Sequence, residues 1–164
     1  MRWLRRVLFV AVVPMAFVQS GCTPPPQLHG TAALDAWVAS HVTTIHEHPS
    51  WLPAQTCGFY NWQVKVIYQD DACMVAHSYG NPAFVEFQIR HEQGHALDHL
   101  VFGLARGSLD CNGFTCRTWE EVANCVGQIA SGVVFATDPA HGYFECPPDE
   151  VARITGLMIA AGTW

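Results

Sequence analysis

The chain has 164 residues, of which 50% are hydrophobic, 12% aromatic and only 13% charged. This composition is typical of a folded chain about one domain long and excludes a disordered one. Lysine and arginine number 8 against 14 aspartate and glutamate residues, and basic residues cluster only within the first six positions. A nucleic-acid-binding protein needs a basic surface, so we expect no nucleic-acid partner.

Residues 1–21 are expected to form a signal peptide. Three arginines lie within the first six residues, and the apolar run that follows at residues 7–18 is too short for a mature membrane span. Ser20 and Gly21 precede Cys22, as in a bacterial lipobox, although Gln19 stands where that pattern usually has leucine. We predict an exported cell-surface lipoprotein with its lipid on Cys22, and a secreted soluble protein is the alternative.

A Pro-rich tether and a single domain are expected after the signal peptide. Residues 22–30 predict an extended tether. Residues 31–164 contain no internal repeat and are expected to form one domain. This part is acidic, so we expect membrane contact only through the lipid on Cys22. The sequence reveals no oligomer interface, and a monomer is the default expectation.

Hydrophobic periodicity predicts the elements of this domain in chain order. Apolar spacing predicts an amphipathic helix over residues 32–47. Alternation predicts a strand over residues 62–68, and residues 73–79 are a candidate return strand after a turn. Apolar residues at helical spacing predict a helix over residues 84–102, with Gly103 at its C-cap.

Two further helices are predicted in the C-terminal third. Thr118 and Glu121 have the spacing of a capping box, in which Thr118 begins a helix that runs to about Ser131. Residues 150–161 predict a last helix after a loop with three prolines. Together the elements predict a small α+β domain with more helix than strand.

Six cysteines remain when Cys22 is set aside, and an even number in an exported chain indicates disulfides. The sequence alone does not select among the pairings. Pairing of nearest neighbours predicts Cys57–Cys73, Cys111–Cys116 and Cys125–Cys146. A thiolate metal site at Cys111 and Cys116 is the alternative, because zinc sites use this spacing, but an oxidising compartment disfavours it.

The segment His91-Glu92-Gln93-Gly94-His95 has the pattern H-E-x-x-H. On a helix, two histidines four residues apart lie on one face, where both imidazoles can bind one metal ion. Glu92 lies about 100° around the helix from His91 and can hold a water molecule beside the ion. The pattern predicts two zinc ligands and a general base. The alternative is a helix with two surface histidines and a solvated glutamate.

A catalytic zinc ion takes three protein ligands and keeps one open position. His99 continues the series of histidines, but it lies about 12 Å along a straight helix from His91, too far to share one ion. We expect His99 to be a satisfied partner at the helix end or a surface residue. Asp98 has the same distance problem and is a candidate hydrogen-bond partner for His95 or its neighbours.

The motif resembles that of the gluzincin group of zinc metallopeptidases, in a small exported bacterial form. These pair an H-E-x-x-H helix with a glutamate on a following helix, often in the pattern Glu-x-x-Ala/Ser-Asp. Residues 120–124 fit this pattern with Glu120 as the ligand. Glu121 is the rival ligand, although the capping box gives it another role. Asn124 stands where the group usually has an aspartate that orients a ligand histidine, and it can still accept a hydrogen bond.

The resemblance implies a zincin-like fold and a peptidase activity. The fold is a short β-sheet packed on the active-site helix, with a second ligand-bearing helix, and the predicted disulfides would staple it. An edge strand of the sheet is expected to hold a peptide or protein substrate. One Zn²⁺ ion per chain would activate water, and Glu92 would take the water's proton and pass it to the leaving amine.

A donor that stabilises the oxyanion is also expected. His141 and Tyr143 are the candidates, and His77 and Tyr79 are their rivals.

Three functions remain open. The favoured one is an exported zinc-dependent peptidase. The second is a non-catalytic surface or binding module with a structural or vestigial zinc site, which a closed set of four protein ligands would indicate. The third is a disulfide-stapled binding domain without metal.

Overall fold

The computed structural model describes residues 30–103, 119–134 and 145–164 of the chain. The signal peptide, Cys22, the tether, the Cys111–Cys116 pair, Thr118, His141 and Tyr143 lie outside the described residues. The elements in chain order are α1 (Thr31–His41), β1 (Thr43–Ile45), β2 (Gly58–Asn61), β3 (Val66–Gln69), α2 (Asp71–His77), α3 (Pro82–Leu97), the π-helical turn η1 (Asp98–Phe102), α4 (Trp119–Ser131) and α5 (Pro148–Ala160).

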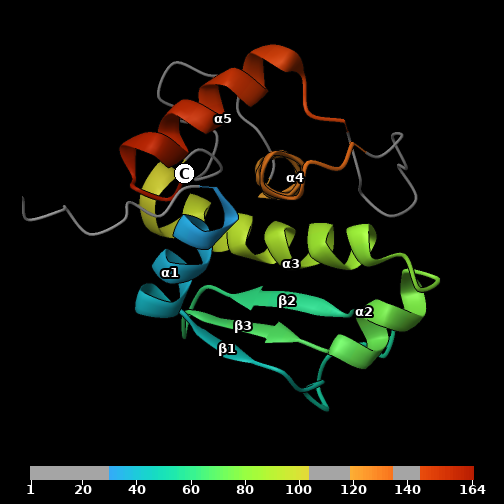
Figure 1. Cartoon of the computed structure of the whole chain (residues 1–164). Coiled ribbons are helices and arrows are strands. Elements are labelled where there is room, and N and C mark those ends of the chain that lie inside the picture. Colours follow the sequence, from blue (N-terminus) through green and yellow to red (C-terminus); the bar gives the residue numbers. More distant parts are fainter. Residues whose placement is uncertain (1–29, 104–118, 135–144) are drawn as a thin grey trace, which may run out of the picture.

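The fold is α+β, as predicted, and α3 lies at its centre. Figure 1 shows the sheet on one side of α3, with α4 and α5 on the other. The three strands have the order β1-β3-β2, with β1 parallel and β2 antiparallel to β3. Tyr60 of β2 and Ile67 of β3 are buried in the same core cluster as Leu97 of α3 and Val126 of α4. Strand β2 is therefore an edge strand that lies against α3.

Helix α3 begins where its sequence provides a cap. The side chain of Asn81 accepts a hydrogen bond from the backbone N–H of Ala83, and Pro82 occupies the first turn. The predicted helix over residues 84–102 is confirmed, although its last turn widens into η1. Gly103 closes it with a φ of 64°, and its N–H donates to the carbonyl of Asp98 at 2.7 Å.

Two glycines allow α3 and α4 to approach closely. A Cβ atom on Gly94 of α3 would lie 2.8 Å from the Cα of Ala123 in α4. A Cβ atom on Gly127 of α4 would lie 2.9 Å from the ring of Phe87 in α3. Both distances are too short for real Cβ contacts, so the absence of side chains at these positions sets the spacing of the two helices.

Two of the three predicted disulfides lie within the described residues, and both are confirmed. Cys57–Cys73 joins the residue before β2 to α2. Cys125–Cys146 joins α4 to the segment before α5. The bonds suggest an oxidising, extracytoplasmic setting for the chain. In the described part of the chain, no helix combines the length and apolar character of a membrane span.

The structure corrects three of the predicted elements. Residues 73–79 do not form a return strand, because Asp70 caps a helix there by accepting from the N–H of Cys73 at 2.9 Å. The strand predicted over residues 62–68 is shorter in the structure, where β3 begins only at Val66. A turn precedes β3, in which Asn61 accepts from the N–H of Gln63 and Lys65 has a φ of 54°.

The first predicted helix, over residues 32–47, is shorter than expected. Helix α1 ends at His41, and the β-branched residues Thr43, Thr44 and Ile45 form β1. They pair in parallel with β3, whose residues lie some twenty positions later in the chain. Local periodicity contains no information about that pairing.

Candidate metal centre

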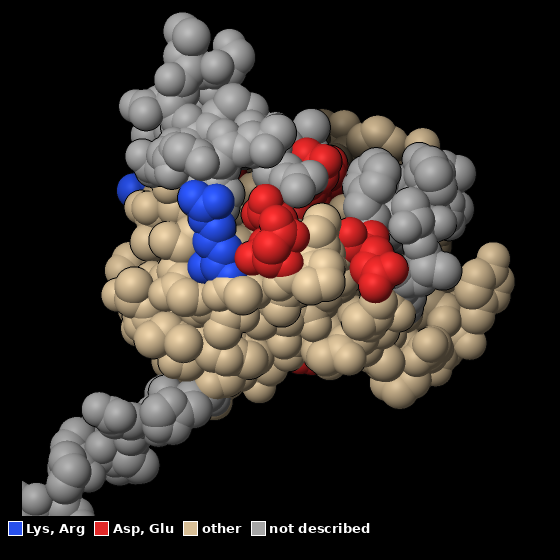
Figure 2. All heavy atoms as spheres, turned by 90° about the horizontal axis from the view of Figure 1, so that it is seen from above, with Lys and Arg blue, Asp and Glu red and all other residues tan. Residues whose placement is uncertain are grey.

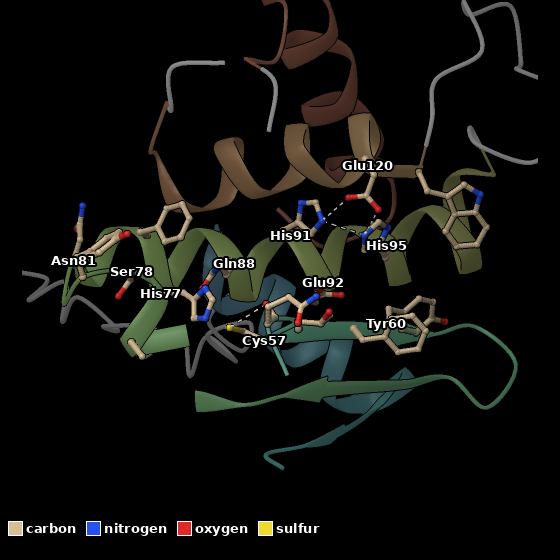
Figure 3. A pocket seen from close by; sticks show the side chains of 18 of the residues that line it. Cys57, Tyr60, His77, Ser78, Asn81, Gln88, His91, Glu92, His95 and Glu120 are labelled. Atoms are coloured by element: carbon tan, nitrogen blue, oxygen red, sulfur yellow. Dashed lines mark hydrogen bonds and ion pairs between the residues drawn. The ribbon is translucent and has the colours of Figure 1, made fainter. Parts of the chain in front are cut away.

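His91 and His95 lie on the buried face of α3, one turn apart. Their Nε2 atoms are 3.1 Å from each other, and both side chains are almost fully buried. The alternative of two surface histidines does not describe this arrangement. Both imidazoles instead point at one place, on the side of α3 that faces α4 (Figure 3).

Glu120 reaches the same place from the first turn of α4. Its Oε2 lies 3.1 Å from Nε2 of His91, and its Oε1 lies 3.6 Å from Nε2 of His95. The three ligand atoms all lie within 4.8 Å of one another. Figure 3 shows the carboxylate above both imidazoles. Glu121 belongs to the same turn of α4 but is not part of this group.

These distances fit a tetrahedral zinc site. Zinc–nitrogen bonds of about 2.1 Å at tetrahedral angles place two ligand atoms about 3.4 Å apart. The separations of 3.1 and 3.6 Å bracket that value. Two imidazoles and a carboxylate are also ordinary donors for a catalytic zinc ion. The residues could thus hold a metal ion such as Zn²⁺ with little rearrangement.

Asn124 lies one turn after Glu120 and holds the ring of His91. The Oδ1 of Asn124 is 2.9 Å from Nδ1 of His91 and accepts its proton. This tautomer leaves the lone pair of Nε2 free to bind a metal ion. Asp98, the other predicted partner, is buried in η1. The Nδ1 of His95 has no hydrogen-bond partner among the described residues.

Glu92 lies between α3 and the edge strand β2. The backbone N–H of Tyr60 donates a hydrogen bond to its carboxylate. A Cβ atom on Gly58 would lie 2.6 Å from its Oε1, so only glycine leaves room for the carboxylate there. The other oxygen, Oε2, has no partner within the described part of the chain.

The environment of Glu92 raises its proton affinity. Burial raises the pKa of this carboxyl to about 7, with a smaller contribution from the charge of Glu120. The charge of His91 and the Tyr60 N–H act in the opposite direction. A group with a pKa near 7 can both take and return a proton at neutral pH.

The other charged groups form a coupled set. Burial, together with the nearby charge of His91, lowers the pKa of His95 to about 4. Burial also acts to lower the pKa of His91, but its hydrogen bond to Glu120 and the charges of Glu92 and Glu120 raise it overall. The hydrogen bond from His91 lowers the pKa of Glu120 in turn. Without a metal ion, a proton on His91 bonds to Glu120, and a bound ion would displace it.

The triad opens into a cleft of about 1230 Å³ between α3, α2 and β2. Gly58, Phe59 and Tyr60 of β2 line one wall. His77 and Tyr79, the rival candidates for stabilising an oxyanion, also line it. His99 does not join the triad, because its Nδ1 bonds to the hydroxyl of Tyr60 at 2.9 Å.

A second group of ligating atoms lies at one end of this cleft. Cys57, Cys73 and His77 bring two sulfur atoms and an imidazole together. The two sulfur atoms are bonded to each other as a disulfide and offer no thiolate to a metal ion. Among the described residues, His91, His95 and Glu120 are thus the one group ready to bind a metal ion.

The sequence analysis did not identify the contribution of β2 to the site. Gly58 and Tyr60 contact Glu92 across 32 or more positions of the chain, and no motif links them. No protein family, curated protein or solved structure was found to match the chain. The resemblance to gluzincins therefore rests on residues 91–124 and on the geometry of the triad.

Acidic side chains gather on the face formed by α4 and α5. The first turn of α4 contains Glu120 and Glu121, and that of α5 contains Asp149 and Glu150. Figure 2 shows acidic groups over this face, where basic ones are sparse. Carboxylates at helix N-termini are favoured by the helix dipole.

Proposed function

We propose that the chain is an exported zinc-dependent peptidase. One observation carries the proposal: two buried imidazole nitrogens and a carboxylate converge on one point, beside a buried glutamate with a raised pKa, in an open cleft. This is the arrangement that hydrolysis by metal-activated water requires. The resemblance of residues 91–124 to gluzincins supports the same activity.

In the proposed mechanism, His91, His95 and Glu120 would hold a zinc ion at the wall of the cleft. Zinc in such a site lowers the pKa of a bound water molecule and polarises a carbonyl group. Glu92 accepts the water's proton on its free Oε2 and delivers it to the nitrogen of the leaving amine. Asn124 keeps the ring of His91 oriented throughout.

The free edge of β2 provides a place for a peptide substrate. The carbonyl of Cys57 accepts from the N–H of Asp70 in the β2–β3 ladder. Bonded pairs alternate along an antiparallel ladder, so the backbone groups of Gly58 and Tyr60 point away from β3. The N–H of Tyr60 bonds to Glu92, so a peptide would pair with the carbonyls of both residues and with the N–H of Gly58. Since both residues line the cleft, an extended peptide can pair with β2 next to the triad.

Export and anchoring are part of the same proposal. The two disulfides support an oxidising compartment, and the N-terminal pattern supports a lipid on Cys22. A peptide or protein outside the cytoplasm would then be the substrate. We propose a monomer that contacts the membrane only through this lipid.

The metal content of the purified, oxidised chain without its signal peptide tests the proposal. We expect about one zinc ion per chain, and none after His95→Ala, because two ligands hold zinc weakly. His46→Ala is the matched control, since His46 is exposed and paired only with Asp71 among the described contacts. Failure of the wild type to bind zinc after reconstitution would contradict the proposal.

A peptidase assay then separates the two zinc-dependent functions. Glu92→Gln keeps the size of the side chain but cannot accept a proton. We expect it to bind zinc and to lose at least about a hundredfold in hydrolysis, the typical contribution of a general base. Zinc binding without hydrolysis by the wild type would instead favour the non-catalytic module.

A further inference from the structure

The cleft has two ends of different chemistry, one on each side of the triad. At the α2 end, the polar side chains of Ser78, Asn81 and Gln88 line the wall together with the rings of Tyr79 and Phe84. At the other end the lining consists of the aromatic residues Tyr60, Trp62 and Trp119. This aromatic end, defined by these three residues, is not used by the proposed mechanism.

The aromatic end begins at the candidate metal ligands. The ring of Trp119, the first residue of α4, lies 6.3 Å from that of His95 between centroids. Trp119 and Trp62 each lie 6.2 Å from His99, and Tyr60 lies 5.8 Å from it. Two segments distant in the sequence, one with Tyr60 and Trp62 and the other with Trp119, thus bring rings to His99. A group bound to the metal would lie next to them.

Exposure makes this end suitable for binding. Trp62 lines the cleft, yet 54% of its surface is exposed. A large exposed ring at the rim of a cleft offers apolar area and a π-face to a ligand. The described lining of the cleft contains no lysine or arginine, so nothing at this end pairs with an acidic side chain. An aromatic side chain can stack on these rings.

We propose that the cleft selects peptides with an aromatic side chain on the N-terminal side of the cleaved bond; this rests on the proposed function. Strand β2 runs from Gly58 towards Trp62. A peptide that pairs with it in the more common antiparallel sense runs the opposite way. Its N-terminal part therefore lies over Tyr60, Trp62 and Trp119, and its C-terminal part lies towards α2.

Amino-acid hydroxamates test this subsite without a known substrate. A hydroxamate binds the zinc ion and places its side chain on the N-terminal side. We expect the zinc-loaded, oxidised chain to bind N-acetyl-phenylalanine hydroxamate about fivefold more tightly than N-acetyl-alanine hydroxamate, a factor typical of one aromatic contact. The cyclohexylalanine analogue should fall between them if ring stacking adds to apolar burial.

Two exposed tryptophans provide a matched pair of variants. Trp62→Leu should reduce the preference for phenylalanine to less than about twofold, because it removes one ring. Trp51→Leu should keep it, since Trp51 is 57% exposed but lies outside the cleft. Trp119→Leu is the second variant at the subsite and should act like Trp62→Leu.

The outcomes distinguish this subsite from the proposed function. If acetohydroxamate fails to bind the zinc-treated chain, the metal site and the proposed function are wrong. If it binds but phenylalanine and alanine hydroxamates bind equally, the subsite alone is wrong. Binding of N-acetylglucosamine oligomers that Trp62→Leu abolishes would also overturn the proposal, because the rings would then stack on sugars.

Discussion

Single residues determine whether Glu92 can act as a base. Its carboxylate fits under β2 only because Gly58 has no side chain, and the N–H of Tyr60 fixes one of its oxygens. The same close fit buries the carboxylate, and this burial is the main cause of the raised pKa. A residue without any functional group therefore controls the proton affinity of the group that acts.

Gly58→Ala is expected to displace the carboxylate of Glu92. The new Cβ would overlap Oε1 at 2.6 Å, so the side chain must move towards solvent. In the metal-free chain we expect the pKa of Glu92 to fall from about 7 towards its ordinary range. A pH titration of the Glu92 carboxyl carbon by NMR measures this. A pKa that stays near 7 would show that strand β2 moves and the Glu92 side chain stays in place.

Asp35 is expected to stabilise the fold in a pH-dependent manner. Burial acts to raise its pKa, but hydrogen bonds from Arg90 and Gln93 and the charge of Arg90 lower it overall. A lowered pKa in the folded state means that the stabilisation is present above the unfolded pKa of about 3.9. It is lost as the pH falls through the folded pKa.

The magnitude of the Asp35 effect is small because half of this side chain is exposed. We expect Asp35→Asn to lower the free energy of unfolding by less than about 1 kcal/mol at pH 7, and to have no effect at pH 2. Urea unfolding at both pH values measures the difference. An equal loss at both would assign the effect to packing rather than to charge.

At the scale of elements, the contact of α3 with α4 assembles the triad. His91 and His95 belong to one helix and Glu120 to the other, so the spacing of the helices sets the distance between the ligands. Gly94 and Gly127 set that spacing. Gly94 lies inside the H-E-x-x-H motif, at one of the two positions that the motif leaves open.

Gly94→Ala is expected to push the two helices apart. Its Cβ would meet the backbone of Ala123 at 2.8 Å, and backbone cannot rotate away. We expect a loss of about 1–3 kcal/mol in the free energy of unfolding, as for other overpacked sites, and weaker zinc binding. Gly156→Ala is the control, because no atom lies within 4 Å of its new Cβ and alanine favours a helix. Urea unfolding and zinc titration of both variants measure the effects.

At the scale of the whole molecule, the sequence predicted what local patterns encode. The α+β class, the central helix and two disulfides follow from periodicity, from Gly103 and from cysteine spacing, and the structure confirms them. The β1–β3 pairing joins distant segments and was not predictable. The helix at residues 71–77 was misread because a short apolar run fits a strand as well as a helix. For the candidate site, the motif indicated His91, Glu92 and His95, but nothing local indicated β2.

The disulfide next to the cleft has a consequence for when the protein matures. Cys57 directly precedes Gly58, so its bond to Cys73 fixes the end of β2 that covers Glu92. In a reducing compartment the two thiols would stay unpaired, and this end of the strand would have no covalent anchor. The cleft wall would therefore be secured only on the far side of the membrane.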